Sequence, residues 1–132
     1  MSDSKEATEK LFKAFVKGFS KKDTGLVAPT LADDFVWSQP TGEDFVGKEA
    51  ALKAMDDRWS AAGGGPVFGN GGFEVIGDTI VQTYEVTSDA PDGTKKTVRG
   101  LDVYKVRGGL LTRKDAYCCL LYTSPSPRDR LK

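Results

Sequence analysis

Three carboxylates stand on strand-like runs in the second half of the chain and could perform acid–base chemistry: Glu85, Asp102 and Asp115. A carboxyl group becomes an effective acid or base near neutral pH when its neighbours shift its pKa. The chain contains no histidine, which excludes histidine-dependent triads and the commonest general base. Proton transfer in this protein must therefore depend on Asp, Glu, Lys, Tyr or Cys.

Two-residue turns predict how these strands pair, because a short turn determines strand register. With a turn at Gly108-Gly109, Asp102 lies opposite Asp115 and Tyr104 lies opposite Arg113. With a turn at Asp92-Gly93, Thr83 lies opposite Asp102. Since side chains alternate along a strand, one face of the sheet is predicted to carry Thr83, Glu85, Asp102, Tyr104, Arg113, Asp115 and Tyr117.

The predicted carboxylate face has two interpretations. If the face is sheltered from water, opposed carboxylates cannot both ionise cheaply, and the pKa of one should rise. If the face is wet, the carboxylates are solvated and Arg113 screens them, and a one-residue bulge would change the register altogether. The opposite face of the predicted sheet carries more apolar side chains and therefore resembles a core more closely. These side chains are Phe73, Val75, Ile80, Tyr84, Val86, Leu101, Val103 and Leu110.

Helices followed by strands must position these residues. Apolar side chains at helical spacing predict a first helix over residues 4–20, with Ser4 as its N-cap, and another over residues 47–62. A short helix is expected after Asp23. Alternation and turn residues predict strands over 34–39, 73–76, 79–88, 95–106 and 110 to about 118, which makes the fold class α+β.

Composition limits the functional classes. A chain of 132 residues suggests one domain, and its net charge of zero argues against a nucleic-acid partner. The polar N-terminus carries no secretory signal, and no apolar run is long enough for a membrane, so a cytoplasmic location is expected. The neighbouring residues Cys118 and Cys119 are poor candidates for a disulfide framework. No spacing motif supports a metal site, and no cofactor is expected.

Three segments together resemble a known family: FKAFVKGFSKKDTGLVAPTLADDFVWSQP, FVGKEAALKAMDDRW and RGLDVYKVRGGLLTRKDAY. Over residues 4–118 they resemble the SnoaL-like branch of the nuclear transport factor two-like fold. The resemblance implies a cone in which three N-terminal helices pack on a curved, mostly antiparallel sheet around an internal pocket. It also implies a homodimer through the outer sheet face, and inward-facing side chains at Asp102, Tyr104, Leu111 and Asp115.

The resemblance suggests roles for individual residues. Polyketide-cyclase-like members use an aspartate on a late strand as the acid–base residue, and this position matches Asp115, with Asp102 beside it to raise its pKa or share its proton. The substrate-binding residues would then be Glu85, Tyr104, Arg113, Trp37, Trp59 and Tyr117, although large aromatic side chains such as the two tryptophans more often belong to the core.

Two other activities of the fold lack their residues. Limonene-epoxide-hydrolase-like members need an arginine where this chain has Thr83 and Glu85, and ketosteroid-isomerase-like members need a first-strand base and a first-helix tyrosine. The expected function is therefore small-molecule binding with proton transfer on an apolar substrate. The alternatives are a non-catalytic ligand-binding or dimerisation module and, more remotely, a protein–protein adaptor.

The end of the chain has a different character. Residues 119–129, CLLYTSPSPRD, resemble the translation of a transposase adapter used in sequencing libraries. The natural domain is accordingly expected to span residues 1–118, with 119–132 as a non-native tail. If the adapter begins within codon 118, the natural residue at Cys118 is either Cys or Trp.

Overall fold

The computed structural model describes residues 4–39, 42–60, 67–89 and 92–117. The predictions for residue 118 and for the tail at 119–132 concern residues outside these ranges. Helices α1 (Lys5–Ser20) and α2 (Thr24–Val27) and the 3₁₀ turn η1 (Ala28–Thr30) come first. They are followed by β1 (Leu31–Ser38), β2 (Asp44–Val46) and α3 (Lys48–Ser60), and then by four strands, β3 (Val67–Ile76), β4 (Thr79–Asp89), β5 (Lys95–Arg107) and β6 (Leu110–Ala116).

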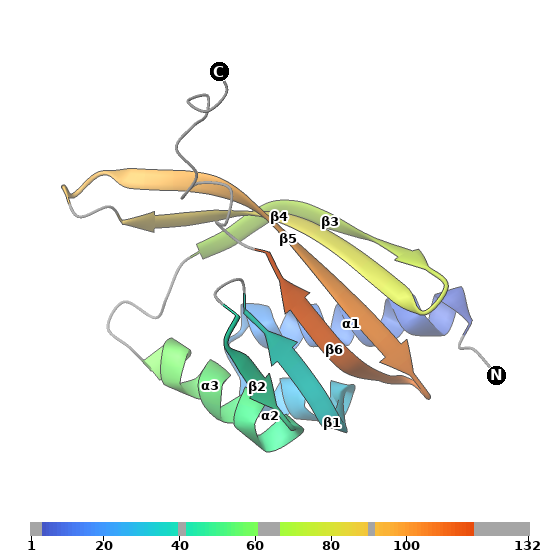
Figure 1. Cartoon of the computed structure of the whole chain (residues 1–132). Coiled ribbons are helices and arrows are strands. Elements are labelled where there is room, and N and C mark those ends of the chain that lie inside the picture. The colour runs from blue at the N-terminus through green and yellow to red at the C-terminus, as the bar shows by residue number, and fades with distance from the viewer. Residues whose placement is uncertain (1–3, 40–41, 61–66, 90–91, 118–132) are drawn as a thin grey trace.

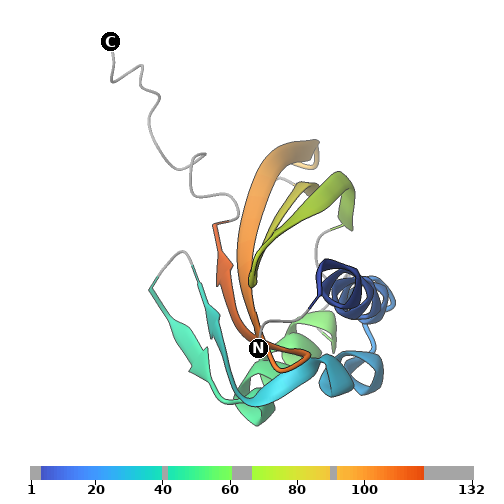
Figure 2. The same ribbon diagram turned by 90° about the vertical axis from the view of Figure 1, so that its right-hand side faces the viewer.

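The strands form one six-stranded sheet in the order β2-β1-β6-β5-β4-β3. Strands β1 and β6 are parallel, and every other neighbouring pair is antiparallel. The sheet is strongly curved, and the helices lie on its inner side (Figures 1 and 2). This arrangement confirms the predicted α+β class and the mostly antiparallel sheet. Strand β2 was not predicted, because three residues are too few to show alternation.

Helix α1 forms where the sequence predicts it. The Ser4 hydroxyl accepts a hydrogen bond from the Ala7 amide at 3.1 Å, as expected of an N-cap. Phe12 and Phe15 are buried on its inner face. Gly18 is buried where the helix meets α2, and a Cβ at this position would lie 2.9 Å from the Val27 side chain. The small residue therefore permits close packing of α1 and α2.

The core lies between the helices and the inner face of the sheet. The Phe12 ring packs edge-on against the Tyr104 ring at 4.7 Å, which joins α1 to β5. Met55 of α3 is fully buried in the same cluster as Trp37 of β1. Burial of these aromatic and aliphatic side chains provides most of the favourable free energy of folding.

The predicted register of β5 and β6 is correct at the turn and wrong beyond it. Arg107 pairs with Leu110 and Val106 with Leu111, as the turn at Gly108-Gly109 predicts. The register then shifts, so that Lys105 pairs with Arg113 and Val103 with Asp115. The predicted pairings of Asp102 with Asp115 and of Tyr104 with Arg113 are therefore wrong. The extra residue is Thr112, whose hydroxyl donates to the Lys105 carbonyl at 3.3 Å, and such a bulge reverses the facing of all residues that follow.

The register of β4 and β5 also differs by one residue. The last pair before the loop is Asp89 with Lys95, so Asp92-Gly93 is not a two-residue turn. The Asp92 carboxylate instead accepts hydrogen bonds from the Thr94 amide and hydroxyl at 3.0 and 2.6 Å. Asp102 consequently pairs with Gln82, and not with Thr83 as predicted.

The corrected register resolves the conflict between the two predicted faces. The apolar β4 residues Ile80, Tyr84 and Val86 now share the inner face with Asp102 and Tyr104. The outer face carries Leu101, Val103, Glu85, Arg113 and Asp115. This pairing places the apolar residues of β4 on the buried face of the sheet. A one-residue slip would turn them toward water, which disfavours the alternative register.

Candidate functional site

A cluster of polar side chains lies on the inner face of the sheet. Its centre is Asp102, a residue that is 3% exposed and whose carboxylate accepts a hydrogen bond from the Tyr84 hydroxyl at 2.8 Å. The Tyr104 hydroxyl lies 3.0 Å from Gln82 Oε1 and 3.5 Å from Asp102 Oδ2. The Lys114 ammonium lies 3.8 Å from the same carboxylate oxygen. We call these five residues, Gln82, Tyr84, Asp102, Tyr104 and Lys114, the inner polar cluster.

Strand pairing brings these residues together. One row of paired residues crosses four strands: it runs from Trp37 of β1 through Lys114 of β6 and Tyr104 of β5 to Ile80 of β4. The adjacent row contains Ala116, Asp102 and Gln82. The cluster therefore combines side chains from three strands, β4, β5 and β6, which are separated along the chain by two turns.

A glycine makes room for the Tyr84 ring. Gly100 pairs with Tyr84, and a Cβ added at Gly100 would overlap the ring carbons of Tyr84. Because Gly100 has no side chain, the ring can lie over β5 and bring its hydroxyl to Asp102. The glycine in RGLDVYKV thus has a steric role next to the site.

Aromatic rings surround the Lys114 ammonium. It lies 4.3 Å from the centroid of the Phe19 ring and 4.7 Å from that of Trp37. The rings of Phe15 and Tyr104 are each 5.9 Å away. An ammonium removed from water needs compensation, and the ring faces and the Asp102 carboxylate both supply negative potential to it.

The Tyr104 hydroxyl keeps its proton throughout the neutral range. Burial raises the pKa of this phenol well above its ordinary value of 10.0, and the electrostatic interactions with Asp102 and Tyr84 and the hydrogen bond to Asp102 act in the same direction. Tyr104 is therefore a hydrogen-bond donor at neutral pH.

A second set of polar groups lies at the end of β1. Arg58 of α3 donates from Nη2 to Gln39 Oε1 at 3.0 Å, and its guanidinium carbon is 4.7 Å from the centroid of the Trp37 ring. Trp37 Nε1 and Gln39 Nε2 are buried, and neither has a hydrogen-bond partner among the described residues. This end of the site presents donors and positive charge.

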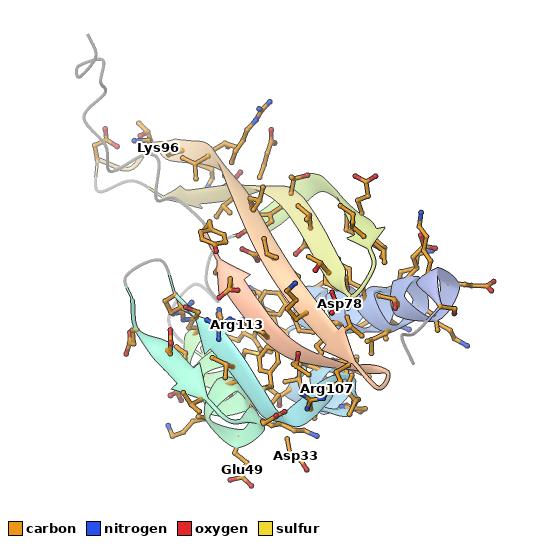
Figure 3. The ribbon with its side chains drawn as sticks, turned by 45° about the vertical axis from the view of Figure 1, so that its right-hand side comes forward. Asp33, Glu49, Asp78, Lys96, Arg107 and Arg113 are labelled. Carbon is orange, nitrogen blue, oxygen red and sulfur yellow. The ribbon has the colours of Figure 1, made fainter. Side chains whose placement is uncertain are left out.

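The structure places three of the predicted site residues on the outer face. Arg113 donates from Nε to both oxygens of Asp115, at 2.9 and 3.0 Å, and the Arg113 and Asp115 side chains are 42% and 24% exposed (Arg113 is labelled in Figure 3). Glu85 pairs with Arg99 on the same face. Asp102 is on the opposite face, so the predicted proton-sharing pair of Asp102 and Asp115 does not form.

The remaining predicted site residues are divided between the core and the edge of the domain. Trp37 is buried, and Trp59 is partly buried with its ring edge-on to Phe19 at 5.1 Å. Tyr117 follows the end of β6, is 47% exposed, and donates from its amide to the Leu101 carbonyl at 2.9 Å. Of the predicted site residues, Asp102 and Tyr104 belong to the inner polar cluster, and Trp37 lies beside it. The functional roles predicted for all of these residues stay predictions.

Sequence reasoning missed Lys114, Tyr84 and Gln82. The alternation of Ile80, Tyr84 and Val86 was a usable signal, since it places Tyr84 and Gln82 on the apolar face of β4. No local pattern indicated Lys114, because only the bulge at Thr112 turns it inward.

The described residues show neither a metal centre nor a membrane-spanning helix. No three acidic or cysteine side chains within residues 4–39, 42–60, 67–89 and 92–117 converge as metal ligands do. None of the helices in the described part of the chain has the length and apolar character needed to cross a membrane.

Comparison with known proteins identifies relatives of the whole domain. The family model of the SnoaL-like domain matches residues 12–114. The structure of TerC co-crystallised with polyporic acid is 18% identical with a TM-score of 0.74, and the match covers 89% of this chain and 95% of that one. A proposed SnoaL-like polyketide cyclase from a Jannaschia species is 14% identical with a TM-score of 0.73, and the match covers 93% of this chain and 94% of that one.

A third similar structure is an NTF2-like protein (NTF2, nuclear transport factor two) of unknown function from Cytophaga hutchinsonii. It is 17% identical with a TM-score of 0.70, and the match covers 82% of this chain and 96% of that one. At such low identities, the likeness of these structures establishes a shared NTF2-like fold. None of the curated proteins matches the chain.

Proposed function

Because the chain belongs to the SnoaL-like domain family, whose model spans residues 12–114, we propose that it binds a small, largely apolar molecule on the inner face of its sheet and transfers a proton there. The structures similar to it include one bound to polyporic acid and a proposed polyketide cyclase, both of which are consistent with a small-molecule ligand. The internal pocket implied by the family forms part of this proposal.

One observation carries the proposal: Asp102 is buried, and its carboxylate is held between the Tyr84 hydroxyl and the Lys114 ammonium. A carboxylate removed from water in this way can accept a proton from an activated C–H group of a bound molecule. The Tyr104 hydroxyl, which stays protonated, can then donate to the oxygen on which negative charge develops. Asp102 therefore takes the acid–base role that the family resemblance assigned to Asp115.

The test is the exchange of carbon-bound protons in deuterated water, with 2-tetralone as a cyclic, mostly apolar ketone. We expect the wild-type protein to accelerate exchange next to the carbonyl, and Asp102→Asn to reduce that acceleration by about 100-fold or more, the usual contribution of a positioned base. The matched control is Asp115→Asn, which removes a carboxylate from the outer face and should leave exchange unchanged. If Asp115→Asn abolishes exchange and Asp102→Asn does not, the acid–base residue is Asp115 and the proposal for Asp102 is refuted.

A non-catalytic ligand-binding module is the second candidate, and a specific observation favours it. Both oxygens of Asp102 already have partners inside the protein, Tyr84 on one oxygen and Lys114 and Tyr104 on the other. Such a closed network can serve as a structural element of the core. A protein that binds apolar ligands saturably and does not accelerate proton exchange would support this second candidate.

The homodimer through the outer sheet face also remains a proposal. Leu101 is 38% exposed at the centre of that face, with Val81 and Val103 partly exposed nearby. A second copy of the chain could cover these side chains. Leu101→Lys should convert the dimer to a monomer in light-scattering measurements, whereas a wild-type monomer would reject the proposal. The cytoplasmic location expected from the sequence stays a prediction.

A further inference from the structure

The end of β1 carries buried hydrogen-bond donors that have no acceptor. Trp37 is 3% exposed, and neither its Nε1 nor the Nε2 of Gln39 meets a hydrogen-bond partner within the described residues. Buried polar groups in folded proteins are almost always paired, so two unpaired donors, one on β1 and one on the residue that directly follows it, need an explanation. We call Trp37, Gln39 and Arg58 the β1 donor group.

The surroundings of the β1 donor group are positive. The Arg58 guanidinium carbon and the Lys114 ammonium each lie 4.7 Å from the centroid of the Trp37 ring. The acceptor of the Gln39 amide is already used, because its Oε1 accepts from Arg58 at 3.0 Å. Arg58 thus donates to an uncharged amide oxygen. The groups left to bind a ligand are N–H donors beside two cations.

We propose that Trp37, Gln39 and Arg58 form a subsite for an anionic oxygen, a carboxylate or an enolate, carried by an otherwise apolar, ring-bearing ligand. An oxygen anion supplies the acceptors that Trp37 and Gln39 lack, and a charge-assisted hydrogen bond is stronger than a neutral one. A cationic ligand would instead meet the Arg58 guanidinium and the Lys114 ammonium beside the Trp37 ring. The inference rests on the proposed small-molecule function and adds the charge and the anchoring point of the ligand.

The apolar part of such a ligand would find aromatic neighbours. The Phe45 ring lies 5.6 Å from the Trp37 ring, and the Trp59 ring lies 5.1 Å from that of Phe19. Phe45 and Trp59 are each partly exposed, and Arg58 is exposed. Because an exposed side chain can move without disturbing the core, displacement of Arg58 would uncover the Trp37 indole and leave its guanidinium able to contact the anion.

The subsite is connected to the inner polar cluster through Lys114. This ammonium lies 4.7 Å from the Trp37 ring and 3.8 Å from Asp102 Oδ2. Lys114 therefore links the β1 donor group to Asp102, and a ligand anchored by its anionic oxygen could extend from that group toward the carboxylate. Anchoring of this kind orients a substrate relative to a base.

The experiment compares two probes of the same shape, 2-naphthoate and the neutral 2-naphthylmethanol, with the full-length ¹⁵N-labelled protein. The indole N–H signals of Trp37 and Trp59 are followed by NMR during titration. We expect 2-naphthoate to shift the Trp37 indole signal saturably and to bind at least tenfold more tightly than the alcohol. Trp37→Phe and Arg58→Met should each weaken the binding of 2-naphthoate at least fivefold. Lys53→Met, which removes an exposed cation from the same helix as Arg58, should leave the affinity unchanged.

The outcomes separate this inference from the proposed function. If the alcohol binds as tightly as 2-naphthoate, the anionic subsite is refuted, while small-molecule binding stands. If neither probe binds, both are refuted. If 2-naphthoate binds through Trp37 and Asp102→Asn leaves ketone exchange unchanged, the anionic subsite is supported and the acid–base role of Asp102 is refuted. The comparison of the two probes on the wild-type protein decides the question even if a variant fails to fold.

Discussion

Replacement of Lys114 by methionine should destabilise the protein far more than an ordinary loss of a lysine. The Lys114 ammonium lies 3.8 Å from Asp102, and both side chains are 5% exposed. At an effective dielectric constant of about 20, two unit charges at this distance attract each other by about 4 kcal/mol. Methionine can fill the space beside the aromatic rings, but the Asp102 carboxylate would lose its counter-charge.

Removal of one partner from a buried ion pair typically costs about 3–5 kcal/mol, because the remaining charge stays buried without compensation. We therefore expect Lys114→Met to lower the free energy of unfolding by that amount, as measured by urea denaturation followed by circular dichroism. The double variant Asp102→Asn/Lys114→Met should recover much of the loss, since no isolated charge remains. The resulting double-mutant cycle should give a coupling energy of about 2–4 kcal/mol.

The chain contains a matched control for this experiment. Lys53 and Asp57 form an ion pair at 3.0 Å on α3, but their side chains are 77% and 63% exposed. Lys53→Met should cost less than about 1 kcal/mol, as exposed pairs usually do. If Lys114→Met costs no more than Lys53→Met, or if the Asp102–Lys114 coupling is near zero, the argument that the inner polar cluster is a buried charge pair is refuted.

Two further predictions concern the same cluster. Gly100→Ala should force the Tyr84 ring away from Asp102 and lower the free energy of unfolding by about 1–3 kcal/mol, and an unchanged urea midpoint would contradict the steric role of this glycine. Because the pKa of Tyr104 is raised above 10.0 in the folded state, the native protein holds this proton more tightly than the unfolded chain. Stability should therefore be unaffected by Tyr104 below about pH 10 and should fall as the pH rises further. Urea titrations between pH 8 and 11 should show a smaller fall for Tyr104→Phe, and equal slopes would disprove the assignment.

Much of the architecture could be predicted from local patterns. The Ser4 cap and the buried phenylalanines define α1, and the turn at Gly108-Gly109 connects β5 to β6 as expected. These features depend on interactions within a few residues of the chain, and such interactions are visible in a sequence. The order of helices and strands, and therefore the α+β class, follows from them.

The candidate site could be predicted only in part, because the sheet face on which each side chain lies depends on strand register over many residues. Asp102 and Tyr104 were expected on a functional face and are found in the inner polar cluster. Asp115 was expected beside Asp102 and instead lies on the outer face with Arg113, since the bulge at Thr112 reverses alternation between the turn and the site. A bulge of one residue leaves no mark in an alternating sequence.

The sequence by itself determined the order and class of the helices and most of the strands in this protein, and which residue types are available for chemistry. Only the tertiary structure decided which of them meet. The β4–β5 pairing and the bulge in β6 set the register, and burial of Ile80, Tyr84 and Val86 against the helices favours that register over its neighbours. The same choice turns Lys114 toward Asp102, so the candidate site arises from the requirement that one sheet face be buried.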